Sequence, residues 1–239
     1  MRGEPNVATV AALIGDPARA AILGVLMDGR ALPAGELAAA GGLSPSGASA
    51  HLTRLLEGGL LAVEREGRHR YYRLAGPQVA TALESLSLIA AQPCRSTIVR
   101  SPQAIALSYA RSCYDHLAGK LGVDIAVALE NRGVITSVGQ SKRLDVTKAG
   151  VAWLDDVFDI DVRKLKAGRH GVAWRCLDWT ERRHHLAGPL GARLLQRCYD
   201  LGWLTRSQNS RAVQLTRKGR NGLRAQLGIG VLNADLNVR

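Results

Sequence analysis

The sequence predicts a mainly α-helical protein with small β-hairpins, an α+β fold in two domains. Three observations lead to this prediction. Helix-capping residues bracket short apolar stretches, brief strand-like runs flank basic tips, and one segment occurs twice. A chain of 239 residues is long enough for two domains with separate cores. We place these domains at 1–91 and 103–239, joined by a linker at 92–102.

The N-terminal domain is predicted to start with capped helices. Asp16 precedes a proline and the apolar stretch ARAAILGVLMDG, and Gly29 follows that stretch. A short helix at 33–40 comes next, and Ser44 then caps the helix SPSGASAHLTRLLEGG. The runs LLAVERE and HRYYRL predict a hairpin. Helix, tight turn, helix and hairpin in this order are typical of a winged helix-turn-helix.

The last helix of this motif and the hairpin have side chains suited to DNA. Small polar residues at a helix N-terminus let the backbone approach the major groove, and a basic hairpin tip reaches phosphates or a minor groove. Taken singly, each feature also fits a capped core helix or a solvated basic hairpin. The predicted DNA-binding residues are Ser44, Pro45, Ser46, Ser49, Ala50, His51, Arg54, Arg65, Arg68, His69, Arg70, Tyr71 and Tyr72.

This part of the chain resembles the ArsR-type bacterial repressors. The resemblance is carried by LSPSGASAHLTRLLEGGLLAVEREGRHRYYRL and by GDPARAAILGVL upstream of it. It implies that the helix at 44–57 enters the major groove and that the hairpin is the wing. It also implies that helices near 6–15 and 77–91 pair two subunits on a pseudo-palindromic operator.

The sequence departs from the resembled family at its sensor positions. Metal-sensing members place two thiols after a Glu-Leu pair, whereas Glu36 and Leu37 are followed here by three alanines. Other members place Asp and His on the last helix, and 77–91 contains neither. The two commonest metal sites of that family are therefore absent from this sequence.

The second domain contains an internal duplication. DHLAGKLG at 115–122 returns as HHLAGPLG at 184–191, an offset of 69 residues. Between 113–154 and 182–223 the ungapped comparison has 12 identities in 42 positions. Such a match indicates one small fold written twice.

Each copy, at about 109–154 and 178–223, predicts a helix, a glycine turn, a strand, a basic tip, a second strand and a helix. The C-terminal domain is therefore predicted to be a tandem pair of degenerate winged-helix-like units. We expect the repeated phrase to mark this fold rather than a function of its own.

The thiol and imidazole groups of this domain are the candidate metal or effector ligands. These residues are Cys113, His116, Cys176, His184 and His185. Cys113 and His116 are three residues apart and are expected to share a helix face. Thiolate and imidazole ligands suit zinc or another thiophilic metal ion.

Simpler explanations and other effectors stay open. Asp178 with Glu181 fits a helix capping box, and Cys113 and Cys198 fit small buried apolar residues. A thiol switch could use Cys176 or Cys94. An organic effector could be held by the four tryptophans, Trp153, Trp174, Trp179 and Trp203.

Charge and composition favour a nucleic-acid partner. The formal charge is +12, and 163–220 carries 14 Lys and Arg against 3 Asp and Glu. No apolar run of membrane-spanning length and no secretory pattern occurs, and the four cysteines are scattered. We therefore expect a cytoplasmic protein with reduced thiols and no membrane partner.

These observations together predict a homodimeric, effector-responsive repressor of double-stranded operator DNA. No motif of a hydrolase, nucleotide-binding enzyme or zinc protease occurs, so no enzymatic activity is expected. One alternative is an enzyme or RNA-modifying factor that uses the winged helix for docking. Another is an architectural nucleic-acid-binding protein without an effector. The tandem domain could also add DNA contacts or act only as a dimer clamp.

Overall fold

The computed structural model describes residues 6–67, 69–90, 102–139, 141–168, 170–207 and 210–230. The chain divides into two compact units, Met1–Leu86 with Gln208–Arg211 and Ser87–Ser207 with Ala212–Arg239. Arg68, Cys94 and the predicted linker, except its last residue, lie outside the described residues. Within those residues, no single helix has the length and apolarity to cross a membrane. One pair, Val7–Ile14 with Pro17–Asp28, meets these criteria only with a bend of 85°.

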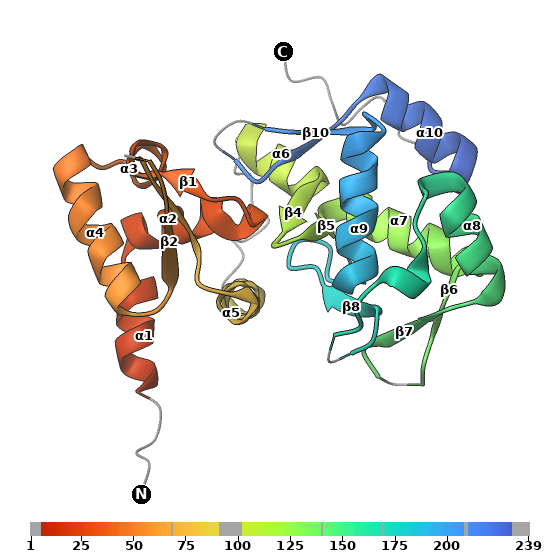
Figure 1. Ribbon diagram of the computed structural model, residues 1–239, viewed down its shortest axis with the longest axis horizontal. Coiled ribbons are helices and arrows are strands. Elements are labelled where there is room, and N and C mark those ends of the chain that lie inside the picture. Colours follow the sequence, from red (N-terminus) through yellow and green to blue (C-terminus); the bar gives the residue numbers. More distant parts are fainter. Residues whose placement is uncertain are drawn as a thin grey trace, which may run out of the picture. The chain divides into compact units, whose positions relative to one another are not determined.

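The first unit has the order of elements that the sequence predicts (Figure 1). Its strands form an antiparallel sheet in the order β1-β3-β2. The elements are α1 (Val7–Ile14), α2 (Pro17–Val25), a 3-10 turn (Leu26–Asp28), β1 (Leu32–Pro33), α3 (Ala34–Gly41), α4 (Pro45–Glu57), β2 (Leu61–Glu66), β3 (His69–Leu74) and α5 (Pro77–Ile89), the last of which runs on into the second unit.

The predicted helix caps of the first unit are confirmed. The side chain of Asp16 accepts a hydrogen bond from the backbone N–H of Arg19 at 2.9 Å, and that of Ser44 accepts from Gly47 at 3.2 Å. Each cap satisfies a donor that the first helical turn leaves free. The apolar faces of these helices meet in a core that includes Ile22, Leu23, Leu37, Leu52 and Leu55. The unit is a winged helix-turn-helix.

The second unit contains the remaining helices and three antiparallel sheets. One sheet has four strands in the order β6-β7-β8-β9, and the hairpins β4-β5 and β10-β11 form the other two. The elements are α6 (Pro102–Tyr109), β4 (Arg111–Cys113), β5 (His116–Ala118), α7 (Gly119–Asn131), β6 (Ile135–Ser137), β7 (Arg143–Val146), α8 (Lys148–Phe158), a 3-10 turn (Val162–Lys164), β8 (Ala173–Leu177), β9 (His184–Ala187), α9 (Gly188–Asp200), β10 (Leu204–Arg206), β11 (Val213–Leu215) and α10 (Arg217–Leu227).

The duplication in the sequence is a duplication in the structure. The first copy runs β4-β5, α7, β6-β7, α8, and the second runs β8-β9, α9, β10-β11, α10. In the shared motif Thr-x-x-Gly, Thr147 and Thr216 each cap the last helix by accepting a hydrogen bond from the glycine N–H at 2.9 Å. A Cβ on Gly150 would lie 2.1 Å from the Val134 carbonyl oxygen, so that position requires glycine.

Two local predictions for the second unit are wrong. Cys113 and His116 do not share a helix face, because they are cross-strand partners in the hairpin β4-β5. The helix begins only at Gly119, whose φ of +80° provides the sharp change from strand to helix. The segment from Asp178 to Glu181 is a turn between β8 and β9, so the Asp178 side chain does not cap a helix.

Candidate nucleic-acid interface and candidate metal centre

The N-terminal part of α4 presents small polar side chains to solvent. Ser44, Pro45, Ser46, Ser49, Ala50 and Arg54 are exposed, whereas the opposite face buries Ala48, Leu52 and Leu55. The wing residues Arg65, His69 and Arg70 are exposed as well. The helix and the hairpin therefore have the surface that direct contact with a DNA groove and its phosphates requires.

Three of the predicted DNA-binding residues have a different environment. Tyr72 is only 7% exposed, because it lies on the central strand β3 and faces the core, so its assignment to the DNA surface is wrong. Tyr71 is half-buried. His51 is half-buried too, with Nδ1 3.5 Å from a carboxylate oxygen of Asp16.

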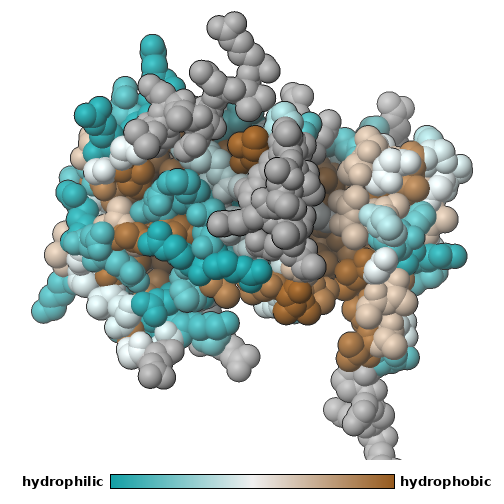
Figure 2. Space-filling view, turned by 180° about the vertical axis from the view of Figure 1, so that it is seen from behind, coloured by the Kyte–Doolittle hydropathy of each residue, from teal (hydrophilic) through white to brown (hydrophobic). Residues whose placement is uncertain are grey.

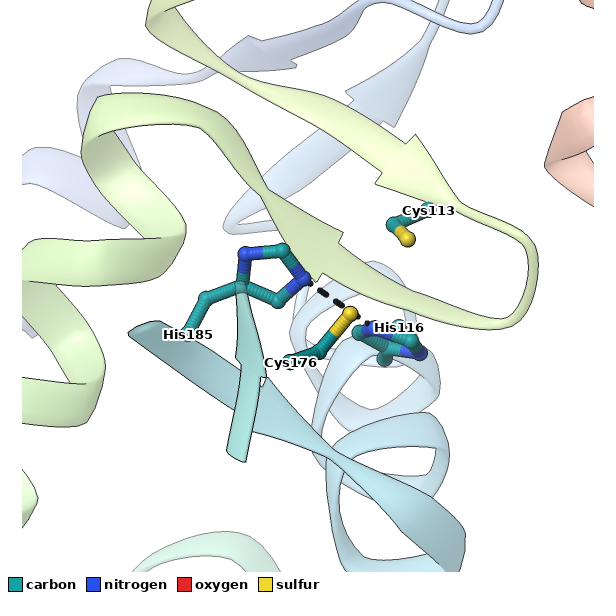
Figure 3. A group of neighbouring side chains, drawn as sticks. All are labelled: Cys113, His116, Cys176 and His185. Atoms are coloured by element: carbon teal, nitrogen blue, oxygen red, sulfur yellow. Dashed lines mark hydrogen bonds between the residues drawn. The ribbon is translucent and has the colours of Figure 1, made fainter. Parts of the chain in front are cut away.

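In the second unit the structure gathers four of the five candidate ligands. The ligand atoms of Cys113, His116, Cys176 and His185 all lie within 4.8 Å of one another. Figure 3 shows the four side chains, from β4, β5, β8 and β9, pointing into one space. We call these residues the thiol–imidazole cluster. His184 is exposed and lies outside the cluster, because neighbouring residues of a strand point to opposite faces.

Each hairpin supplies one thiol and one imidazole from directly opposed positions. Cys113 pairs with His116 across β4 and β5, and Cys176 pairs with His185 across β8 and β9. In the repeat, His116 and His185 are equivalent positions, 69 residues apart. The two copies therefore contribute equal half-sites to the cluster.

Each histidine of the cluster has a carboxylate close to its Nδ1 atom. His116 Nδ1 lies 2.9 Å from Asp115 Oδ1, and His185 Nδ1 lies 3.1 Å from Asp178 Oδ2. When Nδ1 carries the ring proton, the other ring nitrogen, Nε2, has a free lone pair. These two Nε2 atoms lie 3.2 Å apart and both are buried.

Asp178 is the centre of a buried polar network. Its carboxylate accepts hydrogen bonds from Arg111 at 3.0 Å and from the Gly119 N–H at 2.7 Å. It also accepts from the backbone and side chain of Thr180 at 2.9 and 2.7 Å. Burial raises the pKa of Asp178. His185 and Arg111 lower this pKa by a larger amount, so the net shift is downward. This carboxylate is therefore a fixed negative charge that orients His185.

Cys176 of the cluster differs electrostatically from Cys198, another thiol in the same unit. A hydrogen bond from Cys113, together with His116 and His185, holds the pKa of Cys176 far below its ordinary value despite burial. Burial lowers the pKa of His116, but Asp115 and Cys176 raise it more. Cys198 is buried away from the cluster, and burial raises its pKa to about 12. These contacts favour the thiolate form of Cys176, which is the form that ligates metals.

The repeated phrase holds the two halves of the cluster together. α7 packs against β9, and α9 packs against β5. A Cβ on Gly122 would lie 3.6 Å from the Cβ of His185, and one on Gly191 would lie 3.2 Å from the Cβ of His116. The same Cβ atoms would lie 2.6 Å from the carbonyl oxygens of Leu117 and Leu186. Each glycine therefore lets its helix lie close to the strand that precedes it, and Gly191 also leaves room for His116 of the other copy.

The tryptophans do not converge as an effector pocket would require. Trp153 and Trp203 both pack edge-on against Phe158, and the Arg111 guanidinium lies 4.7 Å from the centre of the Trp179 ring. A cavity of about 330 Å³ lies beside the thiol–imidazole cluster and includes His185 in its wall. The rest of its lining is mostly charged or polar and contains no tryptophan.

The carboxylates are the functional residues that the sequence reasoning missed. Both copies contain Cys-x-Asp before the histidine, as Cys113 to Asp115 and Cys176 to Asp178. In the second copy six further residues separate Asp178 from His185, whereas Asp115 and His116 are adjacent. An ungapped comparison therefore hides the shared pattern, and a comparison with one gap would have shown it.

The fold and its exposed helix define the class of protein, a transcriptional regulator with a winged helix-turn-helix DNA-binding domain. Residues 14–64 match the helix-turn-helix domain family. The chain is 40% identical over 228 residues to the Bacillus subtilis protein named uncharacterized HTH-type transcriptional regulator YdfF, covering 95% of this chain and 100% of the relative. The chain therefore belongs to the HTH-type transcriptional regulators.

Two further relatives match less than half of this chain. The HTH-type transcriptional regulator CmtR of Mycobacterium tuberculosis is 36% identical over 110 residues, which cover 44% of this chain and 92% of the relative. Its NMR structure, described as a cadmium metal-sensor, has a TM-score of 0.31 and covers 40% of this chain and 99% of that one. The homodimeric winged helix-turn-helix domain of Mb0332 from Mycobacterium bovis, described as a possible ArsR-family regulator, is 32% identical with a TM-score of 0.33, covering 38% of this chain and 90% of that one.

Proposed function

We propose that this protein is an effector-responsive repressor that binds double-stranded operator DNA as a homodimer in the cytoplasm. The observation that carries the proposal is the division of α4 into a buried leucine face and an exposed face of small polar residues. That exposed face, with the basic wing beside it in sequence, is the arrangement that reads a major groove and grips adjacent phosphates.

The first unit supplies the support for a dimer. α1 is an apolar helix, yet none of its residues is buried within the chain. Val7 is 71% exposed, and Ile89 of α5 is 80% exposed. Figure 2 shows hydrophobic surface on α1, next to the grey N-terminal segment. Exposed apolar area of this kind marks an interface, and the ArsR resemblance implies that these two helices pair the subunits.

The second unit is the part to which we assign the effector response. It contains the thiol–imidazole cluster, which suits a thiophilic metal ion, whereas the packing of Trp153 and Trp203 against Phe158 favours a core role over an organic ligand site. No catalytic reaction is part of this proposal. An enzyme that uses the winged helix for docking would instead turn over a substrate.

Fluorescence anisotropy on duplex DNA from upstream of the protein's own gene tests the proposal, with unrelated duplex as competitor across a salt series. We expect an affinity at least about a thousandfold above that for the competitor. Arg70→Ala should reduce the slope of log affinity against log salt by about one, since it removes one phosphate contact. Lys166→Ala, which removes one exposed charge from the second unit, is the matched control. Equal affinity for both duplexes would refute a site-specific repressor.

A further inference from the structure

The cluster has the composition of a metal site. Two thiols and two imidazoles provide four soft or borderline ligand atoms, and no carboxylate belongs to the set. This composition suits Zn²⁺ and its thiophilic congeners and does not suit Ca²⁺ or Mg²⁺, which prefer oxygen. We propose that Cys113, His116, Cys176 and His185 bind one zinc-class ion, held jointly by the two copies of the repeat.

The orientation of the histidines is the first support. With a proton on each Nδ1 facing Asp115 or Asp178, both Nε2 lone pairs point at the same space from 3.2 Å apart. Two buried lone pairs at that distance repel each other unless a proton or a metal ion lies between them, and a metal ion leaves both Nδ1 protons in place. Tetrahedral zinc with Zn–N bonds of ordinary length places two nitrogens about 3.3 Å apart. The separation is thus already that of two ligands of one ion.

The second support is the pair of thiols in the same space. Metal ligation requires deprotonated cysteines and neutral imidazoles, and in that form the four ligands carry two negative charges, which a divalent cation neutralises. A proton between the histidines would balance only one of these charges. Four protein ligands also close a tetrahedral coordination shell, which leaves no open position for a substrate and is typical of a structural or regulatory site.

The third support is the repetition of the half-site. Each copy provides a cysteine, an aspartate two residues later and a histidine that this aspartate orients. Carboxylate–histidine–metal arrangements of this kind fix the tautomer and raise the basicity of the ligand. The bound ion would join hairpin β4-β5 to hairpin β8-β9, and would therefore connect the two copies through a bond that neither can form alone.

One residue of the cluster also borders a cavity. His185 lies in the wall of the cavity of about 330 Å³, whose other lining residues include Glu130, Arg175 and the exposed His184. The metal assignment does not rest on DNA binding, so either can fail without the other.

The test uses the full-length protein, reduced and freed of metal, with Co²⁺ as a spectroscopic stand-in for Zn²⁺. We expect one equivalent to produce intense ligand-field bands of tetrahedral cobalt and a thiolate-to-cobalt charge-transfer band. Zn²⁺ should then abolish both. This measurement needs no variant, so it holds even if a substituted cluster fails to fold. Absence of both bands in the unsubstituted protein would overturn the proposal.

Matched variants assign the ligands. His185→Gln should weaken metal binding by more than about 100-fold, because losing a ligand costs more than losing a residue that only contacts a ligand. His184→Gln, at the exposed neighbouring residue, should leave metal binding unchanged. Cys176→Ser should reduce the charge-transfer intensity, whereas Cys198→Ser at the buried thiol outside the cluster should not. Retention of unsubstituted affinity by His185→Gln and Cys176→Ser would place the metal elsewhere and refute the site.

Discussion

His116 and His185 face each other with their Nε2 atoms 3.2 Å apart, although 69 residues separate them in the chain. They are equivalent residues of a duplicated motif, and their Nδ1 atoms lie 2.9 and 3.1 Å from a carboxylate oxygen of their own copy. The relationship explains why the chain repeats the phrase His-Leu-Ala-Gly. The phrase supplies the imidazole and the glycine of the turn into the helix, and three residues later Gly122 and Gly191 lie beside the histidine of the other copy.

The first prediction concerns the exposed carboxylate behind His116. Asp115→Asn should weaken metal affinity about 10- to 100-fold, because the amide orients the imidazole but no longer raises its basicity. The side chain of Asp115 is 50% exposed, so folding should be unaffected. Zn²⁺ affinity measured by competition with a chromophoric chelator checks this. Asp124→Asn, a surface residue paired with Lys120, is the control. Identical affinity in both variants would remove Asp115 from the site.

The second prediction concerns the buried ion pair of Arg111 and Asp178. Both side chains are fully buried and their charged atoms lie 3.0 Å apart. Asp178→Asn should lower the free energy of unfolding by about 3–5 kcal/mol, because it leaves a buried guanidinium without its counter-charge. Urea unfolding of the metal-free protein measures the effect.

A surface pair gives the comparison for this ion pair. Asp145 lies 2.8 Å from Arg143, and both side chains are about half exposed. Asp145→Asn should therefore change the stability by about 0–1 kcal/mol. Comparable losses in the two variants would show that burial does not amplify the Arg111–Asp178 interaction.

The third prediction concerns the glycine beside His116. Gly191→Ala should destabilise the protein, because the new Cβ would lie 2.6 Å from the Leu186 carbonyl oxygen and 3.2 Å from the His116 Cβ. Overpacking of this kind typically costs about 1–3 kcal/mol. It should also weaken metal binding, since the two half-sites are pushed apart. Thermal unfolding and Co²⁺ titration measure the two effects.

A glycine-to-alanine substitution at a position with free space around it should increase the stability instead. Gly24 lies within α2, and an added Cβ meets nothing within 4 Å. Gly24→Ala should therefore stabilise the first unit by about 0.5–1 kcal/mol, as expected for alanine in a helix. A stability loss at Gly24 equal to that at Gly191 would contradict the steric explanation.

The fourth prediction concerns subunit pairing through α1. Val7→Lys should weaken the dimer about tenfold or more, since it places a charge where an apolar side chain is expected to be buried. Ile105→Lys on α6, at a residue that is 37% exposed, is the control. Sedimentation equilibrium measures both variants. A monomeric unsubstituted protein, or a Val7→Lys dimer of undiminished affinity, would refute pairing through this helix.

Much of the fold could be predicted because its signals are local. Asp16, Ser44, Thr147 and Thr216 accept hydrogen bonds from backbone donors three residues away, so each cap is visible in a short stretch of sequence. The helix predicted across Cys113 and His116 failed for the opposite reason. The strands of β4-β5 are stabilised by pairing with each other and by packing against α9. Neither contact can be recognised from the spacing of apolar residues along the sequence.

The sequence by itself determined the winged helix and the duplication, and it identified all four residues of the cluster as candidate ligands. Only the tertiary structure decided that Cys113, His116, Cys176 and His185 meet, that His184 stays outside, and that Tyr72 lies in the core. The physical reason is the distance along the chain between the residues that interact. Caps and periodicities depend on neighbours within one or two turns, whereas the cluster depends on α7 and α9 each packing against a strand of the other copy.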